Sequence, residues 1–389
     1  MSVDTRGRRA AQALLQAGER LGPPPDLDRL RRRRRRRVAG RVGLAVAAVA
    51  AVAALAGQAL PRPERTAPDP APPIAAPATT LARPGGRPLD PHIRQVIDTG
   101  KTARSEVAAG PSGVWVLNQH GDPPDELVRV DPGSGGVVAR IGVGHNAARP
   151  VVGPDGLVWL TRAGPGSDRP ELLMVNPATN QVGLTVPLPG ADLGEGTRGL
   201  LVAWDTVWVA DGRGRLLRVA LPFSQAEPVA GATDVGWLAN AGGWVWATSG
   251  GSLLRIDPVD GRVAARIPDP RVQIAAPASA LATGQDSLWL AGAGGSGARL
   301  VRLDWGTGQS KRFIRLPALA EMYRPKLAVG QRVVAARVGQ QLRLIDPATD
   351  KIRATVALGN TTGGVAADGE TIWATESPFG RLLRIDPGF

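Results

Sequence analysis

Short apolar segments separated by turn-forming residues run through the chain from about residue 91 to its end. Gly, Pro, Asp and Asn lie between the segments, which is the pattern of β-strands joined by tight turns. A tryptophan recurs within one type of segment, in "SGVWVL", "GLVWLT", "DTVWVA", "GWVWAT", "DSLWLA" and "ETIWAT". A segment reading "LLRIDP" or a variant of it, as in "LRLIDP", recurs downstream of the tryptophan segments. The pattern therefore predicts one repeated unit of four strands.

The tryptophans recur roughly every 40 residues, and such a period with four short strands is typical of a propeller blade. Seven units can be counted, one of which lacks the tryptophan and aligns on Val334. The last unit ends at Phe389 without a fourth strand, whereas "IRQVIDTG" (93–100) precedes the first complete unit and matches the missing strand. We therefore predict an all-β, seven-bladed β-propeller over residues 91–389, closed into a ring by this N-terminal strand.

Asp-Pro or Asn-Pro dipeptides recur at one place in the unit, as in Asp131-Pro132, Asn176-Pro177, Asp257-Pro258 and Asp346-Pro347. An Asp or Asn side chain binds the backbone ahead of it, Pro presets φ, and a following Gly or Asn supplies the left-handed residue that closes a hairpin. We interpret the Asp residues of these dipeptides as hairpin residues rather than ligands.

Six tryptophans share one position in the unit and are expected to fill the space between blades: Trp115, Trp159, Trp208, Trp246, Trp289 and Trp373. Four others fall outside this register, and one of them lining a binding surface is the alternative: Trp204, Trp237, Trp244 and Trp305.

The segments "VNPATNQVGLTVPLPG" and "IDPATDKIRATVALG" resemble the YVTN-type propeller repeat, and "GPDGLVWLT" with "LLRID" resembles the propeller of virginiamycin B lyase and its relatives. The resemblance covers roughly residues 91–389 and implies the propeller fold. In the lyases it also implies histidines and a glutamate with a bound magnesium ion near the central channel. This chain has only His92, His120 and His145, and the sequence places no pair of them on adjoining inner strands, which argues against lyase chemistry.

Charge is concentrated before the propeller. The chain carries a net charge of +13, of which +9 falls on residues 1–41 and only +3 on the propeller. The propeller thus lacks the electrostatic footprint of a nucleic-acid-binding domain. The absence of cysteine excludes disulfides, thiol catalysis and cysteine-ligated metal.

The first ninety residues predict a membrane anchor. Residues 42–60 contain no charge, close to the roughly 20 residues that span a bilayer, and seven arginines at 31–37 precede them. Because cytoplasmic flanks carry excess Arg, we predict a cytoplasmic basic tail (1–40), a single-pass transmembrane signal-anchor helix (41–60) and an extracytoplasmic propeller. The Pro-rich segment 61–90 is expected to be an extended stalk. A cleaved signal peptide is the alternative, since Ala54-Leu55-Ala56 fits a cleavage site.

Loop length indicates where a site lies. The loops joining strands two and three, and those joining one blade to the next, lie on one face of a propeller and vary widely in length here, whereas the opposite hairpins stay short. Function concentrates on loops held by a rigid scaffold. The candidate ligand-binding residues at the channel mouth are Lys101, Arg104, His145, Asn146, Arg149, Arg198, Glu321, Tyr323 and Arg324. Arginine favours carboxylate or phosphate recognition, so we expect an anionic or mixed-polarity ligand.

The sequence shows no nucleophile elbow, phosphate loop, paired-histidine metal motif or calcium loop. We therefore expect a non-catalytic module that binds a small molecule or protein beyond the membrane, without cofactor, catalytic residue, metal or nucleic acid. The alternative is a lyase- or lactonase-like enzyme of the virginiamycin B lyase type.

Overall fold

The structure, a computed structural model, describes residues 90–389 except 101, 121–123, 164–168, 194–196, 222–224, 269–279, 295–296, 317–324 and 360–361. The predicted basic tail, transmembrane segment and stalk up to residue 89 lie outside the described residues. Within the described part of the chain, no helix is both long and apolar enough to cross a membrane.

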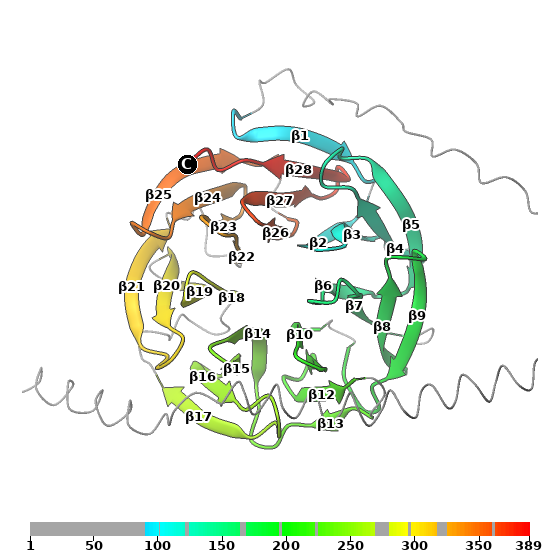
Figure 1. The fold of residues 1–389 in the computed structure, drawn as a ribbon, viewed down its shortest axis with the longest axis vertical. Coiled ribbons are helices and arrows are strands. Elements are labelled where there is room, and N and C mark those ends of the chain that lie inside the picture. Colours follow the sequence, from blue (N-terminus) through cyan, green and yellow to red (C-terminus); the bar gives the residue numbers. More distant parts are fainter. Residues whose placement is uncertain are drawn as a thin grey trace, which may run out of the picture. The chain divides into compact units, whose positions relative to one another are not determined.

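The described residues form seven four-stranded sheets arranged as blades around a central channel (Figure 1). Within each sheet the neighbouring strands pair antiparallel, and the first strand of each blade lies nearest the channel. The predicted seven-bladed, all-β propeller with four-stranded blades is confirmed.

Each blade has four strand positions, from the channel outward. The innermost strands are β2 (Arg104–Gly110), β6 (Ala148–Val152), β10 (Gly199–Ala203), β14 (Val235–Ala241), β18 (Ala280–Gly284), β22 (Lys326–Val329) and β26 (Val365–Asp368). The second strands are β3 (Gly113–Gln119), β7 (Val158–Ala163), β11 (Thr206–Ala210), β15 (Trp244–Ser249), β19 (Ser287–Gly294), β23 (Val334–Val338) and β27 (Thr371–Glu376). The third strands are β4 (Asp125–Val130), β8 (Pro170–Asn176), β12 (Leu216–Ala220), β16 (Ser252–Ile256), β20 (Gly297–Asp304), β24 (Gln341–Asp346) and β28 (Arg381–Ile385). The outer strands are β5 (Val137–Gly144), β9 (Gln181–Pro187), β13 (Glu227–Pro228), β17 (Val263–Pro268), β21 (Ser310–Leu316), β25 (Lys351–Ala357) and β1 (Ile93–Asp98).

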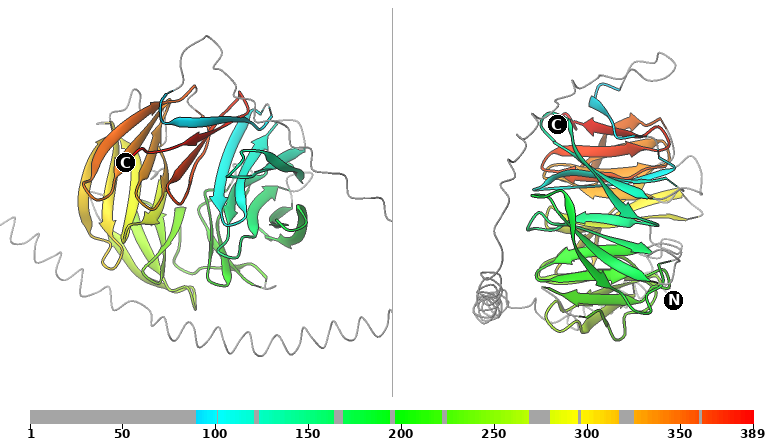
Figure 2. Two further views of the ribbon diagram at one scale, coloured as in Figure 1. Left: turned by 45° about the horizontal axis from the view of Figure 1, so that its top comes forward. Right: turned by 90° about the vertical axis from the view of Figure 1, so that its right-hand side faces the viewer.

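The ring is closed by strands from both ends of the propeller. Blade 1 is β2 to β5 and the numbering continues to blade 7, which consists of β26, β27, β28 and β1. Strand β1 pairs antiparallel with β28, from Ile93 opposite Ile385 to Asp98 opposite Arg381, and the two lie side by side in Figures 1 and 2. The predicted closure by "IRQVIDTG" is confirmed, and it leaves no unpaired third strand at the seam.

The six tryptophans in register are at most 1% exposed and fill the spaces between blades. Trp115 of blade 1 packs with Leu160 of blade 2, and Trp373 of blade 7 packs with Val107 of blade 1. Blade 6 lacks the tryptophan, and Ala336 takes its place opposite the repeated arginine, Arg343. The sequence alignment put Val334 there, two residues too early. The core role predicted for these tryptophans is confirmed, with that correction of register.

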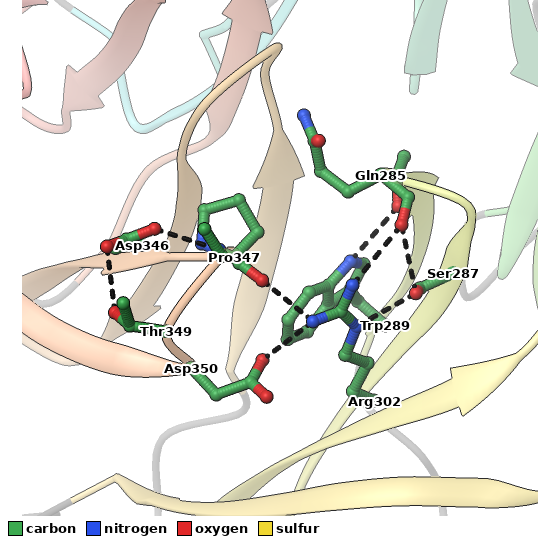
Figure 3. A network of polar contacts seen from close by, with 10 residues as sticks. Gln285, Ser287, Trp289, Arg302, Asp346, Pro347, Thr349 and Asp350 are labelled. Atoms are coloured by element: carbon green, nitrogen blue, oxygen red, sulfur yellow. Dashed lines mark hydrogen bonds and ion pairs between the residues drawn. The ribbon is translucent and has the colours of Figure 1, made fainter.

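The repeated arginine of "LxRIDP" lies opposite the tryptophan and binds the next blade. Arg302 pairs across the strands with Trp289, and its guanidinium carbon is 5.1 Å from the ring centroid. Its Nη1 donates to the carbonyl of Pro347 at 2.7 Å and to Oδ1 of Asp350 at 3.0 Å, while Nε donates to Oγ of Ser287 (Figure 3). The arginine of blade 5 thereby binds the hairpin between β24 and β25 of blade 6.

The same contact recurs around the ring. Arg129 donates to the carbonyl of Pro177 at 2.6 Å and to Oδ1 of Asn180 at 3.0 Å, and Arg255 donates to the carbonyl of Gly306 at 3.0 Å. The repeated arginine of one unit therefore binds the repeated hairpin of the following unit. This contact explains why the arginine and the hairpin sequence recur together.

The Asp-Pro hairpins have the predicted chemistry. Oδ1 of Asp346 accepts from the backbone N–H of Ala348 at 2.8 Å, and its Oδ2 accepts from the Thr349 hydroxyl at 2.7 Å. Asp350, which closes the hairpin, has φ of 56°. The interpretation of these carboxylates as hairpin residues is confirmed.

Candidate functional site

The innermost strands all begin on the face that carries the blade-to-blade connections. Each innermost strand follows a blade-to-blade connection and ends at the turn that leads into the second strand, so all seven run in the same direction along the channel. The first residues of these strands therefore surround the channel mouth on the face that the sequence predicted to be functional.

A cavity of about 200 Å³ lies at this mouth. All seven innermost strands or the residues just before them contribute to it, so it is a property of the closed ring. Its lining residues are Glu106, Val107, Arg149, Pro150, Val151, Gly199, Leu200, Trp237, Leu238, Leu281, Lys326, Leu327, Gly364 and Val365. Three of these side chains carry charge, and most of the others are apolar.

Arg149 is held in the cavity wall by an irregularity of its strand. The register of β6 against β7 shifts between Ala148 and Val151, and Arg149 has φ of 57°, in the left-handed region that is uncommon for residues other than glycine. Its backbone N–H donates to Oε2 of Glu106 at 2.9 Å, and its Nε donates to the carbonyl of Thr197 at 2.9 Å. A β-bulge redirects a side chain in this way, and here it directs the guanidinium across the mouth.

Trp237 faces Arg149 from blade 4. The guanidinium carbon of Arg149 is 4.2 Å from the centroid of the Trp237 ring, which is the geometry of a cation–π contact. The register of β14 also shifts, between Val235 and Leu238, and the backbone N–H of Trp237 donates to Oγ1 of Thr248 at 2.9 Å. Two bulged inner strands thus bring a guanidinium and an indole together at the channel mouth.

Lys326 is the first residue of β22 and supplies the second cation. Burial lowers the pKa of its ammonium from the ordinary value of 10.5. Glu106 opposes this effect, whereas Arg149, Arg337 and Arg104 lower the pKa of Lys326 further. The mouth is therefore an electropositive environment in which a further positive charge is unfavourable.

The structure distributes the predicted site residues unevenly. Arg149 lines the cavity, and Arg104 begins β2, exposed but near enough to influence Lys326. Arg198 lies just before β10, where its Nη1 binds Oδ1 of Asp234 at 3.0 Å.

His145 and Asn146 are exposed in the connection between β5 and β6 and do not line the cavity. The remaining predicted site residues, Lys101, Glu321, Tyr323 and Arg324, lie outside the described residues. The binding role proposed for the whole set stays a prediction.

Sequence reasoning missed two charged residues of the cavity, Glu106 and Lys326. The signal was present, because each is a charged residue inside an apolar innermost strand, in "RSEVAAG" and "PKLAVG". Trp237 was one of four tryptophans outside the repeat register, and it lines the cavity. Trp204, Trp244 and Trp305 pack in the core clusters between blades and do not line the cavity, whereas Trp237 does both.

The three histidines lie apart from the cavity. His92 is at the outer strand β1, where its Nδ1 is 2.9 Å from Oδ1 of Asp90, and neither His120 nor His145 lines the mouth. Among the described residues, no group of three His, Cys, Asp or Glu side chains is placed to hold a metal ion.

The fold defines the protein as a seven-bladed β-propeller with a small, positively charged cavity at one channel mouth. No protein-family model matches the sequence, and no curated protein matches it. Among solved structures, the fold is similar to a chain of Kuenenia stuttgartiensis hydrazine synthase, with a TM-score of 0.59, 14% identity and coverage of 75% of this chain and 97% of that chain. It is also similar to the β-propeller domain of Myceliophteria thermophila Cps50 (Swd1), with a TM-score of 0.58, 11% identity and coverage of 76% and 99%. These likenesses show a shared fold.

Proposed function

We propose that the protein is a binding module whose site is the cavity at the channel mouth. One observation carries the proposal: the starts of all seven innermost strands converge on one cavity, into which two bulged strands direct Arg149 and Trp237. Backbone irregularities of this kind cluster at functional sites. A concave, mostly apolar pocket with a few convergent polar groups is the usual form of a small-molecule site.

The alternative function, a lyase- or lactonase-like enzyme, receives less support from the cavity. The described residues of its lining include one carboxylate, Glu106, and no histidine. Among them, the histidine and glutamate set implied by the virginiamycin B lyase resemblance therefore has no counterpart. The two similar structures carry different names, a hydrazine synthase and Cps50 (Swd1). The fold alone therefore favours neither function.

The proposal includes the place where the module acts. The arginine run and the uncharged segment 42–60 support a single-pass membrane protein with its N-terminus in the cytoplasm. The propeller then acts beyond the membrane, displayed on the Pro-rich segment 61–90 as a sensory or scaffold module.

Native mass spectrometry of the full-length protein in non-ionic detergent tests the binding function. After incubation with a small-molecule extract of the growth medium, the wild-type protein should retain a bound mass that the Leu327→Trp variant, with its cavity filled, does not retain. Val137→Trp is the matched control, since Val137 is 40% exposed on an outer strand. Equal retention by the wild-type and Leu327→Trp proteins, or no retention by either, would contradict the proposed site.

A further inference from the structure

The cations of the cavity have unused hydrogen-bonding capacity. Among the described residues, the ammonium of Lys326 has neither a hydrogen-bond acceptor nor an ion-pair partner. The hydrogen-bond contacts of Arg149 use its backbone N–H and Nε, so its two Nη atoms remain available. Neither group is among the fully buried polar atoms that lack a partner, so both are accessible from the channel. They can therefore bind an anionic group that enters the cavity.

The charge balance of the cavity indicates the charge of that ligand. Arg149 and Lys326 are positive, and Glu106 is the single carboxylate among the described residues of the lining. Oε2 of Glu106 already accepts from the backbone N–H of Arg149. A single negative charge between the two cations would neutralise the excess and favour protonated Lys326. Two further cations near Lys326 weigh less, because Arg337 has Glu376 as a counter-charge and Arg104 is exposed to solvent. One negative charge therefore balances the lining, and a dianion would exceed that balance close to Glu106.

The rest of the lining indicates an apolar body. Leu200, Leu238, Leu281 and Leu327 face the cavity, and Trp237 adds an aromatic face. The volume of about 200 Å³ is slightly larger than an apolar cavity of about 150 Å³ that accommodates benzene. The space therefore suits a molecule of roughly ten non-hydrogen atoms rather than a long chain or a nucleotide.

We propose that the cavity binds a small organic monocarboxylate, with its carboxylate between Lys326 and Arg149 and its apolar body against Trp237 and the leucines. This inference rests on the proposed binding function and specifies its ligand class. Arg149 then has two roles, since its guanidinium contacts both the indole and the carboxylate.

Isothermal titration calorimetry of the full-length protein in non-ionic detergent tests the ligand class with matched probes. Benzoate, phenylacetate and hexanoate are compared with benzamide, phenylacetamide and hexanamide, which keep the shape and lose the charge, and with inorganic phosphate, which lacks the apolar body. At least one carboxylate should bind tenfold or more tightly than its amide and than phosphate. Equal binding of acid and amide, tighter binding of phosphate, or failure of all three carboxylates would overturn the ligand class.

Variants locate the binding and separate it from folding. Lys326→Met should weaken carboxylate binding tenfold or more, whereas Lys351→Met, on an exposed outer strand, should leave it unchanged, and melting curves show whether both variants fold. Binding should also take up protons as the pH approaches the pKa of Lys326, because an anion raises that pKa; titrations in two buffers of different ionisation enthalpy measure the uptake. Unchanged affinity in folded Lys326→Met would overturn the proposal.

The two experiments fail differently. If the extract yields a cavity-dependent bound mass but no carboxylate probe binds, the binding function stands and the ligand class is wrong. If neither gives binding, the proposed function is wrong as well.

Discussion

Arg149 shows how one residue can organise a site that spans several blades. A left-handed backbone conformation costs a residue other than glycine about 1 kcal/mol or more, and it persists when surrounding contacts fix it. Here Glu106 of blade 1 binds the amide, the carbonyl of Thr197 before blade 3 binds Nε, and Trp237 of blade 4 stacks on the guanidinium. The conformation is thus held by contacts from three other parts of the ring.

The pH dependence of stability tests whether the ammonium of Lys326 destabilises the folded protein. Because its folded-state pKa is lowered below 10.5, the unfolded chain binds more protons between the folded-state pKa and about 10.5, so stability should rise with pH in that window. Lys326→Met should remove this rise and increase the melting temperature at neutral pH, as expected when a residue is kept for binding rather than stability.

Thermal melts of Lys326→Met, Lys351→Met and wild-type protein between pH 7 and about 10.5 measure this effect. A lower melting temperature of Lys326→Met at neutral pH would show that the ammonium stabilises the fold. The exposed Lys351 supplies the control for removal of a lysine charge alone.

At the scale of elements, the arginine contacts between blades should matter for stability. Arg302→Ala removes two hydrogen bonds to the next hairpin, one to Ser287 and a long one to the carbonyl of Gln285. We expect a loss of about 2 to 3 kcal/mol in the free energy of unfolding. Arg312→Ala, exposed on β21, should change it by less than about 0.5 kcal/mol. Denaturant titration measures the free energy of unfolding of both variants. If the two variants lose the same amount, the contact between blades makes no net contribution to stability.

The closing strand offers a second test at this scale. Deleting residues 91–100 removes β1, whose Ile93, Val96 and Ile97 are buried, and should cost on the order of 5 kcal/mol. It also exposes β28 as an edge that templates association. Calorimetry and light scattering should therefore show a lower melting temperature and aggregation, while deletion of 61–84 should change neither. A protein lacking 91–100 that melts like wild type would refute a stabilising role of the closure.

The sequence repeat predicted the strands and hairpins but not all the residues of the cavity. A tryptophan every 40 residues or so and the "LxRIDP" segment are periodic, so the blades, the hairpins and the closing strand follow from pattern alone. The cavity depends on departures from that pattern: Arg149 and Trp237 lie at register shifts, and a shift of one residue decides which way a side chain points. Arg149 was found from its loop position, whereas Glu106 and Lys326 acquire meaning only when the ring brings blades 1 and 6 together.

At the scale of the whole molecule, topology is the open prediction. Protease added to intact cells should remove the propeller and spare a tag at the N-terminus, because the arginine run is expected to keep residues 1–40 inside. Immunoblots for the tag and for the propeller measure this. A protected propeller would contradict the orientation, and spontaneous release of a soluble propeller would support the cleaved signal peptide instead.

The seam of the ring would also bear mechanical load if the chain is tethered as proposed. A pull on the tether enters β1 at Ile93, whereas β28 is held by the rest of the ring at Arg381, at the opposite end of the paired strands. Force directed along the strands would then load all the hydrogen bonds between β1 and β28 together, with the chain that continues from β1 into β2 sharing the load. Force directed across the strands would peel the bonds one at a time. The resistance of the propeller to tension would therefore depend on the direction of the pull.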